Sequence, residues 1–426
     1  MNADERARLV REVELSGSCS HPIRLKGEMV NLATGEVAMS SLRVPCKDRR
    51  RAVCPACSYL YKADAWIMVS AGLVGGKGTS KLVSTHPRHF VTLTAPSFGS
   101  VHTVRVDGRC VSRSRAGVKG LDQCAHGQAR FCNFRHEEKD SRLGRPICDR
   151  CFNYEGAVLW NAHASKLWNN TIQSIRRSLA EEAGLVQTKL HMVAQLHYLK
   201  VAEMQRRGLV HFHVVVRADG PDSVDADPPV WLTSELLARA VRNSVSQARA
   251  TGLAGGYNQW GRVLDIRDMA LDSDDAHKVA SYVAKYSTKT TDGTKDLAYR
   301  FHHRRQIENL SRDAHIRQMA LTAWDLADRP ELAPLHLRDH AHAFGFTGQL
   351  ITKSRRYSTT FGAMRTARAE YMKQQNTGEP VAGTFYYDGR GYDDPRGTEL
   401  AELFFTMQQE LRDEALESRL GSGAAS

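Results

Sequence analysis

The stretch VAEMQRRGLVHFHVVVR, residues 201–217, decides the expected fold, because its composition predicts two β-strands joined by a tight turn. Side chains two residues apart share one face of a strand, so His211 and His213 are expected to point the same way. Such a histidine pair is also common on strands that bind no ligand. Its meaning therefore depends on what lies opposite it in the sheet.

The turn between the two strands determines which residue faces the histidines. The Arg-Arg-Gly sequence at 206–208 fits a three-residue loop that ends in a left-handed glycine. In that register Gln205 pairs with Leu209, and Glu203 lies opposite His211 on the same face. Two imidazoles and a carboxylate form a donor set suited to Mg²⁺ or Mn²⁺. A two-residue loop would place Glu203 on the other face, so this third ligand is conditional on the turn.

A second motif, HKVASYVAKYSTK at 277–289, predicts a helix with Tyr282 and Tyr286 one turn apart on the same face. A tyrosine phenol has a pKa of about 10, so a tyrosine nucleophile requires nearby positive charge to favour the phenolate. Lys285 and Lys289 are candidates for that role. The alternative is an amphipathic helix with interfacial tyrosines and solvated lysines. In combination with the hairpin, the motif predicts a tyrosine nucleophile beside a metal site.

The ordered motifs resemble a known family. The strand FVTLT at 90–94, followed by the histidine hairpin and the tyrosine helix, resembles the three motifs of rolling-circle replication initiators, which are HUH endonucleases. More narrowly, the chain resembles the initiators of actinobacterial, Streptomyces-type plasmids and integrative elements. The phrases TLTAPSFG at 92–99, LGRPIC at 143–148 and TKSRRYS at 352–358 resemble that subfamily too. The resemblance covers roughly residues 19–370.

The alternation of strands and helices with hairpin connections predicts an α+β protein. The resemblance implies an antiparallel-sheet HUH nuclease core of ferredoxin-like or RRM-like type, with His211, His213 and Glu203 as metal ligands. It implies Tyr282 or Tyr286 as the nucleophile, with Tyr286 preferred for the first cleavage. The expected product is a 5′-phosphotyrosine and a free 3′-hydroxyl that primes synthesis. The alternatives are an HUH transposase or mobilisation relaxase, and a non-enzymatic zinc DNA-binding protein.

The chain has nine cysteines, and all of them lie in its first 151 residues. CPAC at 54–57 and CDRC at 148–151 have the spacing of zinc knuckles, and such sites contribute folding free energy directly. One or two structural Zn²⁺ ions are expected. One partition places Cys19, Cys46, Cys54 and Cys57 on one zinc, and draws a second site from Cys110, Cys124, His126, Cys132, His136, Cys148 and Cys151. Another joins the two CxxC pairs in one ribbon-like site.

The formal charge of +12 and the pI near 9.3 favour a polyanionic partner such as DNA. Three basic clusters are candidate contacts with DNA phosphates, and solvated basic surface is the alternative for each. They comprise Arg49, Arg50 and Arg51; Arg206 and Arg207; and Lys353, Arg355 and Arg356 around Tyr357.

Four segments are expected along the chain. They are a Cys-rich zinc-binding region at 1–85; an endonuclease core at 86–300, with its first strand at 89–94 and a Cys-rich insertion at about 105–155; a helical basic DNA-binding region at 301–375; and a C-terminal helix with a disordered tail at 376–426.

No stretch is apolar enough for a membrane span or a signal peptide, so a cytoplasmic protein without a membrane partner is expected. The expected partners are single-stranded or hairpin origin DNA and, because no phosphate-binding loop is present, a host helicase and polymerase.

Overall fold

The computed structural model describes residues 2–104, 110, 123–221, 226–253, 255–269, 273–288, 295–310, 313–375 and 381–423. The chain forms two compact units. The first combines Met1–Trp66 with Thr360–Ser426, and the second is Ile67–Thr359. These boundaries differ from the four expected segments, because a strand near the C-terminus pairs with one near the N-terminus and so brings both ends of the chain into one unit.

The second unit is built on a five-stranded sheet in the order β8-β3-β5-β4-β9, with every neighbouring pair antiparallel. The strands are β3 (Arg88–Leu93), β4 (Gln195–Met204), β5 (Val210–Asp219), β8 (Leu264–Asp268) and β9 (Ile351–Lys353). The hairpin β4–β5 and the strand β3 lie where the sequence predicts them. The expected α+β class with an antiparallel sheet is confirmed.

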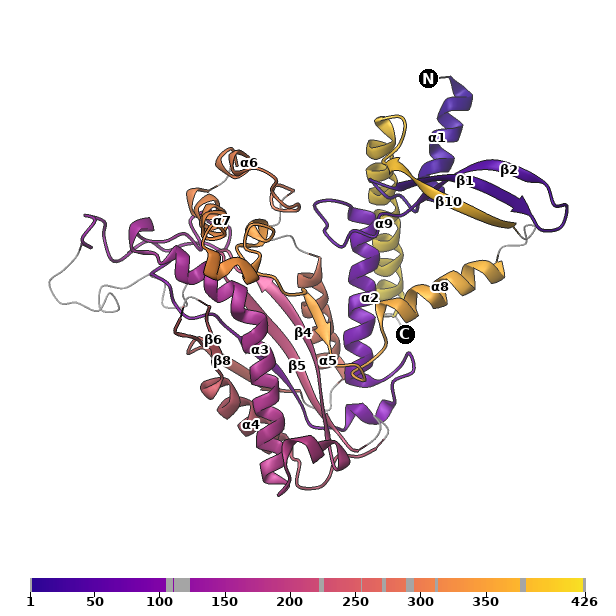
Figure 1. Ribbon diagram of the computed structural model, residues 1–426. Helices are drawn as coiled ribbons and strands as arrows, with labels where there is room; N and C mark the ends of the chain where they lie inside the picture. Colours follow the sequence, from indigo (N-terminus) through magenta and orange to yellow (C-terminus); the bar gives the residue numbers. More distant parts are fainter. Residues whose placement is uncertain are drawn as a thin grey trace. The chain divides into compact units, whose positions relative to one another are not determined.

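One face of this sheet is covered by α3 (Tyr154–Glu182) and α4 (Ser234–Gln247), as Figure 1 shows. Helix α3 begins at the N-cap Asn153, whose side chain accepts a hydrogen bond from the Gly156 amide. Its apolar side chains recur at helical spacing and join the same core as Phe212 of β5. Each large side chain buried there stabilises the fold by about 1.5–3 kcal/mol.

The opposite face carries the histidines and packs against α5 (Ser273–Ser287), which contacts β4. Ala276, Ala280, Val283 and Ala284 of α5 are buried, and their spacing of four, three and one residues forms a single helical stripe. Small side chains at three of these positions allow the helix to approach the sheet closely. The two tyrosines of α5 lie beside this stripe.

The remaining elements of the second unit are short. They are η1 (Lys81–Ser84), η3 (Asp149–Cys151), η4 (Gln187–Met192), β6 (Ala250–Thr251), β7 (Tyr257–Asn258), α6 (Arg304–Glu308), α7 (Ala314–Leu326), η5 (Pro330–Leu335) and η6 (Ala341–Ala343). Helix α7 packs against α3 and so extends the same hydrophobic core.

The first unit has a three-stranded antiparallel sheet in the order β10-β1-β2. Its strands are β1 (Ile23–Asn31), β2 (Val37–Val44) and β10 (Val381–Arg390), and its helices are α1 (Ala3–Leu15), α8 (Phe361–Gln375) and α9 (Arg396–Gly423). Helix α2 (Pro55–Val74) begins in this unit and ends in the second. A small core joins Leu9 and Val13 of α1 to Tyr392 and Ala401.

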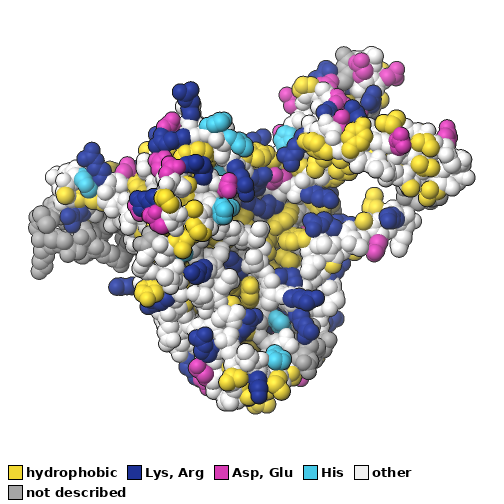
Figure 2. All heavy atoms as spheres, viewed as in Figure 1, with side chains coloured by type: hydrophobic (Ala, Val, Ile, Leu, Met, Phe, Trp, Pro, Cys, Tyr) yellow, Lys and Arg dark blue, Asp and Glu magenta, His cyan; other side chains and the backbone are white. Residues whose placement is uncertain are grey.

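The molecular surface is charged. In Figure 2 the lower part of the visible face carries many Lys and Arg side chains and few Asp or Glu side chains. Among the described residues, no helix has the length and apolar composition that a membrane span requires.

One buried amide fixes the turn of the histidine hairpin to α3. The Asn161 side chain donates to the main-chain oxygens of Gly208 (2.8 Å) and Phe344 (3.0 Å), and it accepts from the Val210 amide at 3.0 Å. Asn161 is fully buried. Its removal would leave three main-chain groups without these partners in a region that water does not reach.

We therefore expect Asn161→Ala to lower the free energy of unfolding by roughly 3–5 kcal/mol. Asn170→Ala is the matched control, because Asn170 is an exposed residue of the same helix with one hydrogen bond to the Arg249 oxygen. The control should cost less than about 1 kcal/mol. Urea unfolding followed by circular dichroism measures both, and equal effects would show that Asn161 does not hold the turn.

Candidate active site and metal centres

The turn at 206–208 sets the register of the histidine hairpin. Gly208 has a φ of +75°, and the Gln205 amide donates to the Leu209 oxygen at 2.9 Å. Glu203 consequently lies directly opposite His211. This is the register that the three-residue loop predicts, so the carboxylate shares a face with both imidazoles.

The three side chains of that face are neighbours. The Nε2 atom of His213 lies 3.2 Å from Oε2 of Glu203, and the ring centroids of His211 and His213 are 4.6 Å apart. Both histidines are buried, and the Nδ1 atom of His213 has no hydrogen-bond partner among the described residues. Two imidazoles and one carboxylate on one face are donors of the kind that a divalent cation takes.

His211 is oriented by its neighbours. The Gln205 amide nitrogen lies 3.1 Å from its Nδ1 atom, and the oxygen of that amide accepts a hydrogen bond from Arg207 Nε at 2.8 Å. Burial lowers the pKa of His211 to about 3, and the nearby charges of His213 and Arg207 act in the same direction. The ring is therefore neutral near pH 7, which is the form that binds metal ions.

Both predicted tyrosines lie against His213. The ring centroid of Tyr282 is 5.0 Å from that of His213, the Tyr286 centroid is 5.3 Å from it, and the two tyrosine centroids are 4.7 Å apart. Tyr282 is 41% exposed, whereas Tyr286 is half-buried. Burial, a hydrogen bond with Tyr282 and the charge of Glu203 all raise the pKa of Tyr286. The more accessible phenol is thus that of Tyr282.

A cavity of about 450 Å³ opens beside these groups, lined by Tyr282 and the two histidines and by residues of β3 and β8. The register places Asp265 of β8 opposite Thr92 of β3, and Thr92 opposite His213. The sequence analysis did not include Thr92, Asp265 or the neighbouring Arg267 in the site. The alternation in LDIRD was the available signal, but only the strand order brings that segment to the cavity.

The structure describes only one of the two candidate lysines. Lys285 is exposed on α5, between the two tyrosines in sequence. Lys289 lies outside the described residues. The structure therefore places one of the two predicted cations on the tyrosine helix.

The arginines of the turn differ from each other. Arg206 is exposed. Arg207 instead donates to the main-chain oxygens of Ala95 and Pro96 at 3.1 and 3.2 Å, and burial lowers its pKa to about 10. Arg207 thus ties the hairpin turn to the segment after β3, whereas Arg206 is exposed and donates to the Asp140 main-chain oxygen at 3.3 Å.

The other two basic clusters also contain both hydrogen-bonded residues and residues exposed to solvent. In the first unit, Arg50 is paired with Asp48 and burial lowers the pKa of Arg49, whereas Arg51 is exposed. In the second unit, the Lys353 ammonium donates to the main-chain oxygens of Ser354, Arg355 and Ser358. Arg355 and Arg356 are exposed, and Tyr357 is buried. Arg51, Arg355 and Arg356 are therefore the members of these clusters presented to solvent.

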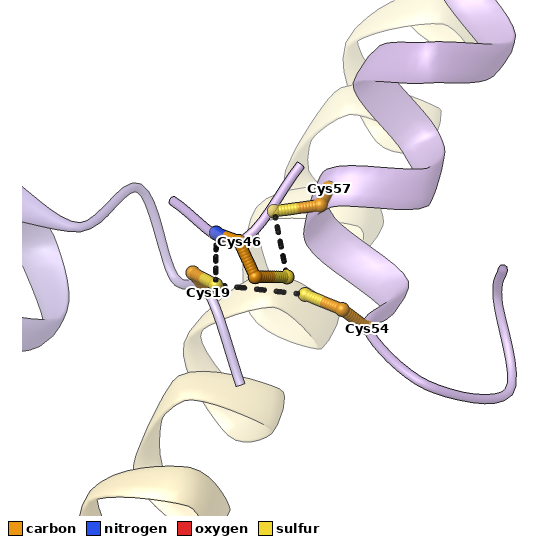
Figure 3. A group of neighbouring side chains, drawn as sticks. All are labelled: Cys19, Cys46, Cys54 and Cys57. Carbon is orange, nitrogen blue, oxygen red and sulfur yellow. Dashed lines mark hydrogen bonds between the residues drawn. The ribbon is translucent and has the colours of Figure 1, made fainter. Parts of the chain in front are cut away.

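Four cysteines converge in the first unit, and Figure 3 shows their sulfur atoms pointing toward one another. The Sγ atoms of Cys46 and Cys57 are 3.7 Å apart, and those of Cys19 and Cys54 are 3.8 Å apart. Thiolates arranged tetrahedrally at zinc–sulfur bonds of about 2.3 Å would be about 3.8 Å apart. The structure thus brings together the four cysteines that the sequence analysis assigned to one zinc, in a geometry that fits this ion.

The ligands that were expected to form one second site belong to two separate clusters in the second unit. The candidate ligands divide into His102, Cys110, Cys132 and His136, and into Cys124, His126, Cys148 and Cys151. The described residues therefore contain three cysteine-containing clusters able to hold a metal ion, whereas one or two structural zinc ions were expected. The alternative ribbon-like site is wrong, because its two CxxC pairs lie in different clusters.

The sequence analysis missed His102, and it named His126 only among the candidate ligands of a single second zinc site. His102 lacks a paired spacing that would mark it as a ligand, because chain folding brings it to its partners. Its Nδ1 atom is 3.1 Å from His136 Nε2 and 3.6 Å from Cys110 Sγ. His126 Nδ1 lies 3.3 Å from Cys151 Sγ. Ligands around a tetrahedral zinc with one imidazole and one thiolate are about 3.5 Å apart, so both clusters match that geometry.

Comparison with known proteins gives one family and one relative. The model of the family described as "Replication initiator protein, pSAM2" matches residues 5–405. A replication initiator protein of Streptomyces ambofaciens is 37% identical over 377 residues, which cover 85% of this chain and 77% of that protein. No solved structure matches the chain. The family match spans the candidate nuclease site and the three metal clusters.

Proposed function

This chain belongs to the pSAM2 family of replication initiator proteins, and we propose that it initiates rolling-circle replication by nicking one strand of its origin DNA. The nick would leave the protein joined to the 5′ end through a phosphotyrosine, with a free 3′-hydroxyl that primes synthesis. The observation that carries this proposal is the contact of Tyr282 and Tyr286 with the face that holds His211, His213 and Glu203.

The chemistry follows from the residues of this face. A Mg²⁺ or Mn²⁺ ion held by His211, His213 and Glu203 would supply Lewis acidity to the scissile phosphate. The tyrosine phenol gives up its proton to solvent as its oxygen attacks the phosphorus, the bond to the 3′ oxygen breaks, and the departing oxygen takes up a proton from solvent. The buried and neutral His211 matches the role of a ligand, which must not be protonated.

We assign the first attack to Tyr282. It lines the cavity and is 41% exposed, so a DNA phosphate in the cavity can reach its phenol. Tyr286 is half-buried, and its raised pKa opposes formation of the phenolate. This order is the reverse of the preference in the sequence analysis. Tyr286 would then serve the second cleavage that closes a round of replication, with Lys285 as the candidate cation on this helix, while Lys289, the other predicted cation, lies outside the described residues.

The arrangement also supports an HUH nuclease core of the RRM-like type. The histidine strand β5 lies at the centre of an antiparallel sheet, between β3 and β4. Two helices cover one face and the tyrosine helix α5 lies on the other. A transposase or relaxase of the same class would share this core, and family membership favours replication over those roles.

The remaining parts of the proposal concern ions and partners. Thiolate and imidazole donors favour Zn²⁺ in the three clusters, where the ions would be structural. Exposed arginines such as Arg51, Arg206, Arg355 and Arg356 would contact phosphates of single-stranded or hairpin origin DNA. A host helicase and polymerase would unwind and extend the nicked strand in the cytoplasm. A zinc protein that only binds DNA is the second candidate, and the metal clusters are the observation that favours it.

The double variant Tyr282→Phe, Tyr286→Phe should form no covalent adduct with an origin oligonucleotide, because both nucleophilic oxygens are absent. Tyr282→Phe alone should slow adduct formation at least about tenfold, and Tyr286→Phe alone should slow it less. Denaturing gels measure the adduct, and fluorescence anisotropy measures DNA binding, which should persist. Tyr257→Phe is the control, because Tyr257 is an exposed tyrosine of the same unit. Wild-type nicking by the double variant would reject the tyrosine mechanism.

Glu203→Gln should raise the Mn²⁺ concentration that gives half-maximal nicking by about 10–100-fold, because a neutral amide binds a cation less strongly than a carboxylate does. His211→Ala should abolish metal-dependent nicking. His191→Ala serves as the control, since His191 is exposed and its Nδ1 atom lies 2.8 Å from the Thr188 main-chain oxygen. An unchanged Mn²⁺ dependence in both Glu203→Gln and His211→Ala would exclude the hairpin as the metal site.

A further inference from the structure

The His102 cluster, defined as His102, Cys110, Cys132 and His136, is connected to the turn of the histidine hairpin. The carboxylate of Asp140 lies 2.7 Å from His136 Nδ1, and the main-chain oxygen of Asp140 accepts a hydrogen bond from Arg206 at 3.3 Å. A ligating histidine commonly donates its second ring nitrogen to a carboxylate, which fixes the orientation of the ring. One residue therefore contacts both a cluster histidine and the turn.

The main chain of the same segment also meets the turn. Gly144 has a φ of +87°, and a Cβ atom there would lie only 2.6 Å from the main-chain carbonyl carbon of Arg206. Its amide donates to the His102 oxygen at 2.9 Å. The close approach leaves no room for a side chain at residue 144. The loop 136–144, defined by these residue numbers, thus packs directly on the turn 206–208.

The segment around the cluster has little apolar material of its own. Among the described residues, its buried core consists of Cys110 and Cys132, with Ile147 packed against them. Asp140 is held by hydrogen bonds from Arg142, through its amide at 2.8 Å and its guanidinium at 2.8 Å. With so small a core, an ion bound by the four side chains would contribute most of the local folding free energy.

The turn 206–208 fixes the pairing register of β4 and β5, which places Glu203 on the face of the histidines. A slip of one residue between β4 and β5 would move Glu203 to the face that packs on α3. The other contacts of the turn come from Asn161, from His315, whose Nε2 lies 3.1 Å from the Arg207 oxygen, and from the hydrogen bonds of Arg207. The loop 136–144 covers the Arg206 side, which these contacts do not reach.

We propose that the His102 cluster binds a Zn²⁺ ion that positions the nuclease site, by holding the loop 136–144 against the turn 206–208. Two thiolates and two imidazoles at tetrahedral spacing are the donors that zinc prefers. The ion takes no part in the cleavage chemistry. The positioning role of the ion rests on the proposed nicking function, whereas the binding of the ion by the cluster does not depend on it.

The test compares two cysteine variants of the full chain. Cys132→Ser removes a ligand of the His102 cluster, and Cys46→Ser removes one from the cluster in the first unit. Mass spectrometry under native conditions should find three zinc ions in the wild type and two in each variant. Hydrogen–deuterium exchange should rise at least about tenfold over the turn peptide in Cys132→Ser, because the Gln205 and Gly208 amides lose their fixed partners. It should not change there in Cys46→Ser.

A third variant separates the contact from the ion. Gly144→Ala keeps every ligand, so it should keep three zinc ions, yet the added Cβ should displace the loop and raise exchange over the turn. In both Gly144→Ala and Cys132→Ser the Mn²⁺ concentration for half-maximal nicking should rise more than about fivefold. Peptides of α3 should stay protected, which distinguishes a local change from unfolding.

Each outcome has a defined consequence. Three zinc ions in Cys132→Ser would overturn the metal site. Loss of one ion with wild-type exchange over the turn and wild-type Mn²⁺ dependence would overturn the positioning role. If the wild type forms no adduct with origin DNA, the proposed nicking function fails, while zinc content and exchange still decide whether the ion holds the turn.

Discussion

The pairing register of β4 and β5 is the constraint on which the rest of the site depends. Side chains alternate between the faces of a strand, so Glu203 joins the histidines only if the turn contains three residues. Gly208 supplies the left-handed conformation, and the buried Asn161 amide fixes the turn to α3. The sheet then presents its donors to α5, whose buried stripe of small side chains brings the two tyrosines against His213.

The metal clusters concern the folding of the Cys-rich segments and not the chemistry of the histidine face. Around the His102 cluster, the described residues form only a small buried core of Cys110 and Cys132, with Ile147 packed against them. Thiolates and imidazoles that converge on an ion can replace that core. Two of the three clusters lie in the same unit as the nuclease site, and one of them contacts its turn through Asp140. Structural and catalytic parts of this unit are thereby joined by a few hydrogen bonds.

Local patterns predicted the hairpin and the helix that carry the candidate site, and long-range contacts accounted for the elements that they missed. The two-residue alternation at 210–217 and the four-residue spacing of the tyrosines identified the hairpin and the helix. Nothing local indicated that β10 pairs with β1, or that β8 would border the cavity, because both depend on strands distant in sequence. His102 was missed for the same reason, because its ligand partners come close to it only once the chain has folded. The role of the basic residues stays a prediction, and only side-chain packing distinguishes the half-buried Arg207 from the exposed Arg206.

The central claim is that a tyrosine of α5 becomes joined to DNA beside the histidine hairpin. The most direct measurement is mass spectrometry of the peptide that remains covalently attached after the protein is incubated with an origin oligonucleotide and Mn²⁺. The account predicts a phosphodiester on Tyr282, with Tyr286 modified only when the first tyrosine is replaced or a second strand is supplied. An adduct on any residue outside α5, or cleavage without an adduct, would contradict it.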